Sequence, residues 1–175
     1  RVDPDGRVFP LANGSATVTA TVGGQAVSVP VTVTDMDAPL PINFTNQIEP
    51  ILTKLSCNSG GCHGKIQGQN GFRLSLLGFE PDLDYTTLVK EGRGRRLFPA
   101  APDGSLFLLK AAGVVPHGGG KKTEVGSEEY KVLRRWIASG LPYGLPTDPV
   151  VTKVTVFPDA RVLERQARQQ LVVHA

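Results

Sequence analysis

The sequence is poor in the side chains that usually bind metals or form disulfides. Its 175 residues include only two cysteines, one methionine and three histidines. Two cysteines in a chain of this length do not make a disulfide scaffold, because disulfide-stabilised domains are small and rich in cysteine. Any role for these few residues must therefore be inferred from the sequence around them.

Long apolar runs and long runs of one charge are also missing. No stretch approaches the ~20 apolar residues that cross a bilayer, so we expect no transmembrane segment. The formal net charge is +3, and the Lys and Arg residues are dispersed, which does not indicate nucleic-acid binding. With 20 Gly and 14 Pro, the composition is typical of a loop-rich globular chain.

The first segment alternates Val and Ala with Thr and Ser. Two such runs, over residues 15–22 and 27–34, flank Gly23 and Gly24. Alternation with a period of two around a Gly-Gly turn predicts a β-hairpin. Residues 35–41 contain turn formers and prolines and predict a linker.

Helical periodicity begins beyond this linker. We expect a helix over 46–55, with Asn46 and Glu49 as a capping box, and a second helix from Ser127 as the N-cap to Gly140. Shorter elements are expected at other places: a helix over 105–112 and strands over 151–157 and 169–173.

The most informative stretch contains both cysteines. Cys57 and Cys62 are separated by four residues, and His63 follows directly. Covalent haem needs two thiols that add to its two vinyl groups and a histidine immediately after the second thiol. The usual spacing has two intervening residues; here Gly60 and Gly61 are expected to let the longer loop fold back.

Three other interpretations of these residues stay open. The cysteines could form a small-loop disulfide, which leaves His63 without a role. Cys57, Cys62, His63 and a distant histidine could bind zinc. The cysteines could also be reduced and purely structural.

A haem iron also needs a ligand on its distal side, and there are few candidates. Met36 lies in the linker, and His174 lies close to the C-terminus. His117 precedes three consecutive glycines, whose lack of side chains lets a loop close over a flat cofactor. We predict His117 as the distal ligand.

Other residues could contact the haem periphery. Carboxylate groups of haem need cationic partners, and Arg95 and Arg96 are our candidates, with Arg93, Lys121 and Lys122 also available in loops. Trp136 is predicted to pack against the haem edge, whereas Tyr130 suits an ordinary core.

Several motifs, taken in order, resemble the planctomycete-type cytochrome c domains. The resemblance covers about Ile42 to Tyr143 and rests on the haem motif and on five further runs: 71–79 with 82–85, 94–96, 102–110, 116–120 and 136–140. It implies haem c in a mostly α, class I-like cytochrome c fold over residues 42–145. Many related domains carry Met-Pro-Pro where this chain has Pro116, His117 and Gly118, so we expect two histidine ligands here.

The flanking segments resemble bacterial immunoglobulin-like domains of the group 2 type. This resemblance implies all-β segments on both sides: the later strands of one domain over residues 1–34 and the opening strands of another over 146–175. A complete sandwich needs about seven strands. Either these are pieces of larger domains, or chains associate head to tail so that one chain's last segment completes another's first.

The predicted function is electron transfer by a mono-haem c-type cytochrome module that is not an enzyme. The redox partner is unknown. Covalent haem attachment implies a periplasmic, cell-surface or secreted location. Two alternatives stay open: a haem-based sensor or catalytic centre with a displaceable His117, and a structural or adhesive protein in which haem is a staple.

Overall fold

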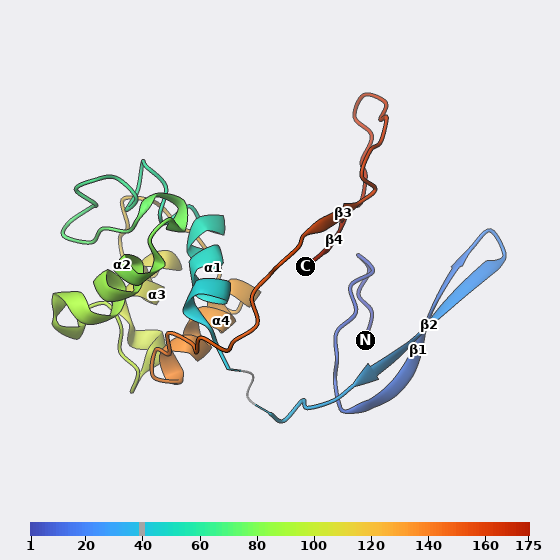
Figure 1. The fold of residues 1–175 in the computed structure, drawn as a ribbon, viewed down its shortest axis with the longest axis horizontal. Coiled ribbons are helices and arrows are strands. Elements are labelled where there is room, and N and C mark those ends of the chain that lie inside the picture. Colours follow the sequence, from blue (N-terminus) through green and yellow to red (C-terminus); the bar gives the residue numbers. More distant parts are fainter. Residues whose placement is uncertain (39–40) are drawn as a thin grey trace. The chain divides into compact units, whose positions relative to one another are not determined.

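A computed structural model describes residues 1–38 and 41–175 of the chain. Two compact units make up the structure, Arg1–Pro41 and Ile42–Ala175 (Figure 1). Part of the predicted linker, residues 39–40, lies outside the described residues. None of the described helices has the length and apolarity that a membrane crossing requires.

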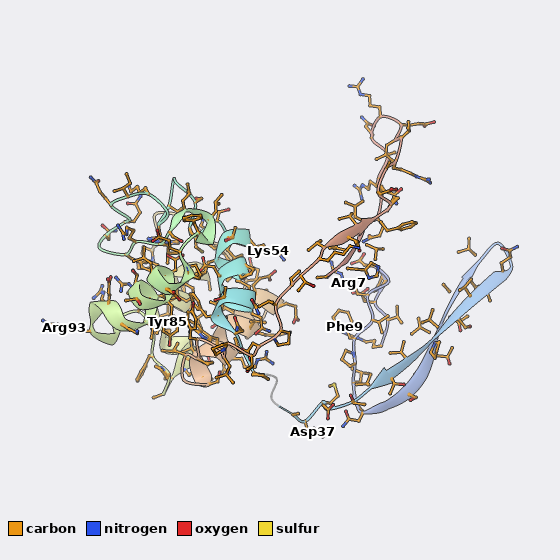
Figure 2. The ribbon with its side chains drawn as sticks, viewed as in Figure 1. Arg7, Phe9, Asp37, Lys54, Tyr85 and Arg93 are labelled. Atoms are coloured by element: carbon orange, nitrogen blue, oxygen red, sulfur yellow. The ribbon has the colours of Figure 1, made fainter. Side chains whose placement is uncertain are left out.

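The first unit is built around one β-hairpin. Strands β1 (Gly14–Val22) and β2 (Gln25–Val33) pair antiparallel, with Val22 opposite Gln25. Gly23 and Gly24 both have positive φ, as a two-residue turn of the primed type requires. The predicted hairpin is therefore confirmed. Its side chains stand on both sides of the ribbon and most of them are exposed (Figure 2).

The second unit contains nine short helical segments and two short strands. The α-helices are α1 (Glu49–Lys54), α2 (Pro81–Tyr85), α3 (Leu106–Ala111) and α4 (Glu128–Ala138). The 3₁₀ and π segments are η1 (Phe44–Ile48), η2 (Leu76–Gly78), η3 (Thr86–Lys90), η4 (Glu91–Gly94) and η5 (Pro102–Gly104). Strands β3 (Thr155–Phe157) and β4 (Val172–His174) pair only with each other.

The predicted fold class is wrong. The described residues form two separate two-stranded sheets beside short helices, which is a mixed chain and not a mostly α cytochrome c domain between immunoglobulin-like segments. The alternating pattern identified β1 and β2 and, over shorter ranges than predicted, β3 and β4, but among the described residues each strand pairs only within its own two-stranded sheet. The longest helix has 11 residues, because Pro and Gly interrupt the helical periodicity elsewhere. Head-to-tail completion depended on half-sandwiches and has no basis in this fold.

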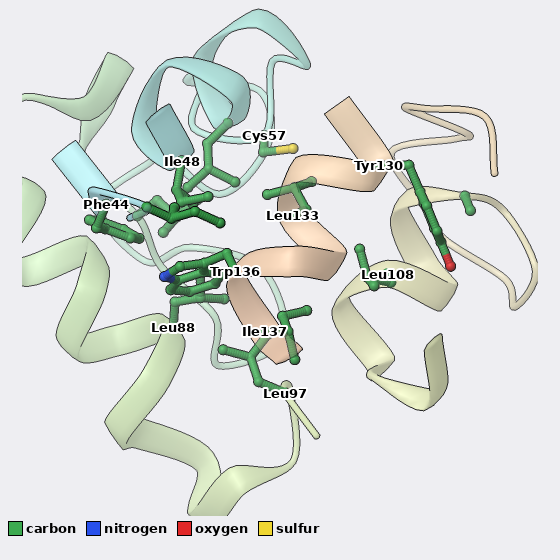
Figure 3. Packing of buried hydrophobic residues seen from close by; sticks show 14 residues of the cluster. Phe44, Ile48, Cys57, Leu88, Leu97, Leu108, Tyr130, Leu133, Trp136 and Ile137 are labelled. Atoms are coloured by element: carbon green, nitrogen blue, oxygen red, sulfur yellow. The ribbon is translucent and has the colours of Figure 1, made fainter. Parts of the chain in front are cut away.

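Apolar side chains from distant segments form one core in the second unit. Trp136 and Leu133 of α4 are fully buried against Phe44 and Ile48 of η1 and Leu52 of α1 (Figure 3). The centroids of the Phe44 and Trp136 rings are 5.6 Å apart, and the indole nitrogen of Trp136 donates to the Pro142 carbonyl at 2.9 Å. Helix α4 therefore anchors the segment before Cys57 to the segment after Gly140.

The two helix starts show where sequence patterns succeed and fail. Ser127 caps α4 as predicted, its hydroxyl accepting from the Tyr130 amide. The capping box predicted at Asn46 and Glu49 is wrong. Asn43 is the cap instead: its side chain accepts from the Asn46 amide at 2.9 Å, and its own amide donates to the Gln47 side chain.

Glu49 belongs to a buried polar cluster rather than to a cap. Its carboxyl accepts from the Asn58 side-chain amide at 3.0 Å, and the same amide donates to the Thr53 hydroxyl. Burial, and then the nearby Asp84 carboxylate, raise the pKa of Glu49 to about 7. Because Asn58 directly follows Cys57, the Glu49 carboxyl supports the start of the cysteine loop.

This cluster predicts that stability falls as the pH rises towards neutral. The folded protein keeps the Glu49 proton up to about pH 7, whereas the unfolded chain releases it near its ordinary pKa of 4.5. The contribution of Glu49 to the free energy of unfolding is complete below the pKa of the unfolded chain. It is lost as the pH rises through the pKa of the folded protein, a change of about 3 kcal/mol. Glu49→Gln should remove most of this pH dependence, measured by urea unfolding at about pH 5 and about pH 8. Glu91→Gln, at an exposed position, is the control, and equal slopes in wild type and Glu49→Gln would contradict the assignment.

Candidate functional site

The loop between the cysteines is wound tightly by its own backbone. The Cys57 amide donates to the Leu52 carbonyl at 2.8 Å, so the loop begins where α1 ends. The His63 amide donates to the Cys57 carbonyl at 3.0 Å, and the Cys62 amide donates to the Ser59 carbonyl at 2.9 Å. The four intervening residues thus fold back, and His63 is hydrogen-bonded to the first cysteine of the motif.

The glycine that this loop requires is Gly64, and the sequence pattern pointed to others. A Cβ at position 64 would lie 1.9 Å from the Asn58 carbonyl oxygen, which no side chain tolerates. A Cβ at Gly61 would meet nothing within 4 Å, and one at Gly60 would make only an ordinary contact at 3.7 Å with Leu76. The close approach occurs after the histidine, where the loop passes over its own start.

The two cysteines differ in their surroundings. Cys57 is buried with the apolar core, and Cys62 is half-buried. Both are free thiols. Burial raises the pKa of the Cys57 thiol to about 11, which keeps it protonated at neutral pH. A neutral thiol or thioether suits this environment better than the thiolate that zinc requires.

His63 is held by the carbonyl of Phe72. Its Nδ1 lies 2.9 Å from that oxygen, and the two ring centroids are 4.4 Å apart. Because a carbonyl only accepts, Nδ1 carries the hydrogen, and Nε2 is left with a lone pair. Burial lowers the pKa of His63, which favours this neutral form. A histidine with its Nδ1 bound to a carbonyl has the arrangement seen in metal-ligating histidines.

His117 has the same arrangement in the opposite loop. Its Nδ1 lies 2.8 Å from the Gly120 carbonyl, so its Nε2 is also free to accept. The Lys110 ammonium donates to the Pro116 carbonyl at 2.9 Å, and this hydrogen bond fixes the residue that precedes His117. A Cβ at Gly119 would lie 3.2 Å from His117 Cε1 and 3.5 Å from Nε2, so glycine keeps this part of the ring clear.

The imidazole rings of His63 and His117 lie near each other with almost parallel planes. Their centroids are 6.2 Å apart, and their planes differ by 8°. Two metal–nitrogen bonds of about 2 Å, added to about 1.1 Å between each nitrogen and its ring centre, separate the two centres by roughly 6 Å. The centroid separation of His63 and His117 therefore matches the one that a shared metal would give.

Two cavities meet at this pair of histidines. The first has a volume of about 340 Å³ and the second about 250 Å³, and both are lined by His63 and His117. Cys57 lines the first, and Cys62 lines the second. The first lies within the size range of cofactor sites and has a largely apolar wall. Its other lining residues include Phe72, Arg95, Arg96, Lys110 and Lys122.

Only some of the residues predicted to contact the haem periphery line the two cavities. Arg95 is exposed and lines the first cavity, as Arg96 does. Arg96 also donates to two backbone carbonyls, those of Thr87 at 2.7 Å and Gly71 at 2.6 Å. Trp136 does not line either cavity; it lies in the core. Lys110 lines both cavities, and it was not among the candidate site residues predicted from the sequence.

The alternative in which the two cysteines bind zinc finds less support. Within residues 1–38 and 41–175, no group of three or more His, Cys, Asp and Glu side chains is arranged to bind a metal ion. The zinc set of Cys57, Cys62, His63 and a distant histidine is therefore not assembled. Haem iron differs, because the porphyrin supplies four ligands and the protein needs only two. Met36 belongs to the first unit, and His174 is exposed on β4.

Comparisons with protein-family models, with curated proteins and with solved structures find no match to this chain.

Proposed function

We propose that the second unit carries one covalently attached haem c and transfers electrons. The observation that carries the proposal is the His63–His117 pair: parallel rings 6.2 Å apart, each with Nδ1 on a backbone carbonyl. A second observation is independent of the first. The cavities on which these rings open are lined by one cysteine each, so a flat group between the rings would have a thiol available at its edge.

Four side chains would hold the cofactor. The thiols of Cys57 and Cys62 would each add across one vinyl group, forming a carbon–sulfur bond while the thiol hydrogen passes to the other vinyl carbon. No oxidant is consumed, and the resulting thioethers are neutral, which suits the buried position of Cys57. His63 and His117 would supply Nε2 from opposite sides. When bound, haem supplies reversible one-electron chemistry at its iron.

The protein would determine how the cofactor behaves. If His63 and His117 both held the iron, no position would be open for oxygen or peroxide, which would favour an electron carrier over an enzyme. Neutral imidazoles, a largely apolar wall and the cations of Arg95, Lys110 and Lys122 would set the charge balance around the iron and the carboxylate groups of haem. The donor and acceptor would be redox proteins outside the cytoplasm, where haem c is attached.

Carbon monoxide tests the carrier proposal. The reduced protein should not bind it readily at neutral pH, because His117 would occupy the position that the gas needs. The measurement is the absorption spectrum of the reduced protein before and after equilibration with the gas, with a five-coordinate haem protein as the positive control. Rapid and complete binding would favour the alternative function, a sensor or catalytic centre with a displaceable His117.

A further inference from the structure

Arg96 occupies an unusual place for a cation that lines the proposed cofactor cavity. Its guanidinium is half-buried and donates through Nη1 to the Thr87 carbonyl at 2.7 Å and through Nη2 to the Gly71 carbonyl at 2.6 Å. Its Cζ lies 4.8 Å from the centroid of the Phe72 ring. Two terminal nitrogens and one face of the guanidinium are therefore already engaged by the protein.

The contacts of Arg96 with Gly71 and Phe72 hold one short turn, residues 69–72. Gln69 and Phe72 pair with each other, their amides donating to each other's carbonyls at 2.9 and 3.0 Å. Asn70 and Gly71 between them both have positive φ, the conformation of a tight two-residue turn. Arg96 fastens this turn to η3 through Thr87.

The turn that Arg96 holds in place in turn orients His63. The Phe72 carbonyl accepts from His63 Nδ1 at 2.9 Å, while the Phe72 ring packs against the imidazole on one side and meets the guanidinium of Arg96. Arg96 thus has two routes to the histidine, one through the backbone next to Phe72 and one through its ring. A lysine could keep the charge but could not donate to two carbonyls from a planar fork.

We propose that Arg96 is a positioning residue, which fixes the orientation and tautomer of His63 by clamping the turn of residues 69–72. This deepens the proposed function, because the tautomer decides which nitrogen His63 offers to an iron, and the hydrogen bond at the other nitrogen tunes its basicity as a ligand. Arg96 is then distinct in role from Arg95, which lines the same cavity and is exposed.

The test compares Arg96→Lys with the matched control Arg95→Lys in the full chain, prepared without haem. The imidazole ¹⁵N shifts of His63 report its tautomer directly. In wild type and in Arg95→Lys, Nδ1 should carry the hydrogen. In Arg96→Lys the ratio of tautomers should move about fivefold towards Nε2–H, the size expected for weakening one hydrogen bond. An unchanged ratio in Arg96→Lys would overturn the proposal.

Phe72→Leu provides a second route if Arg96→Lys does not fold. It removes the ring that both Arg96 and His63 contact and keeps the carbonyl, so it should give a smaller shift in the same direction. A tautomer ratio equal to that of wild type would count against the proposal. In protein that has incorporated haem, Arg96→Lys should also change the reduction potential more than Arg95→Lys. If neither the wild type nor any variant takes up haem, the proposed function fails. The tautomer measurement still decides the role of Arg96.

Discussion

Replacing His63 by alanine should prevent stable haem incorporation. This histidine is the only ring in the cysteine loop, and its amide and Nδ1 are both fixed by hydrogen bonds, which leaves Nε2 as its ligand atom. Loss of a partner that merely orients a metal ligand costs roughly 10- to 100-fold in affinity or activity, so loss of the ligand itself should cost at least as much. Haem content should therefore fall by at least about tenfold relative to wild type, measured as haem absorbance per protein after maturation in an oxidising compartment.

The appropriate control is His174→Ala. His174 is exposed at the end of β4 and should retain full haem content. Equal haem content in His63→Ala and wild type would contradict the role of His63 as the proximal ligand. The thermal stability of both variants without haem would show whether His63→Ala still folds.

Replacing His117 by alanine should change the spin state without releasing the cofactor. The thioethers to Cys57 and Cys62 and the bond from His63 would remain, so the haem should stay attached. With no imidazole on the distal side, the iron should become five-coordinate or bind water, and the absorption spectrum should change from low-spin to high-spin. Carbon monoxide should then bind to the reduced variant, whereas the wild type should not bind it readily.

Gly118→Ala provides a control in the same loop. A Cβ at position 118 would meet nothing within 4 Å, and the φ of Gly118 is not in the left-handed region, so the loop should tolerate it. Gly118→Ala should keep the wild-type low-spin spectrum. An unchanged low-spin spectrum in His117→Ala would show that another side chain is the distal ligand.

Local sequence patterns predicted individual elements well. Strict alternation around Gly23 and Gly24 identified the first hairpin, and Ser127 with the following glutamates identified the start of α4. Both signals act over a few residues, so tertiary contacts were not needed to interpret them. The cysteine motif and His117 are far apart in sequence, yet the structure brings the rings of His63 and His117 to a centroid separation of 6.2 Å.

What the sequence could not predict depends on contacts between distant segments. Asn46 and Asn43 are equally good caps by type, and only the packing of η1 decides that Asn43 is used. The need for Gly64 arises because the loop crosses the Asn58 carbonyl, which no spacing rule reveals. The immunoglobulin-like interpretation failed for a related reason: alternation shows that a strand forms but not which strands it will pair with.

Arg96 illustrates the same limit at the site itself. From sequence it was one of several cations expected near the haem carboxylates, equivalent to Arg95 beside it. The structure separates the two because Arg96 reaches the Thr87 and Gly71 carbonyls. Phe72, whose carbonyl orients His63, was not among the candidate site residues, since a backbone oxygen is common to every residue.

The pyridine haemochrome spectrum of the purified full chain tests the central claim most directly. The protein should first be extracted with acidified organic solvent, which removes haem that is not covalently bound. If Cys57 and Cys62 both carry thioethers, the colour should stay with the protein, and the spectrum should be that of haem with both vinyl groups saturated, at one haem per chain. A colourless protein with two titratable thiols, or haem that passes entirely into the solvent, would contradict the account.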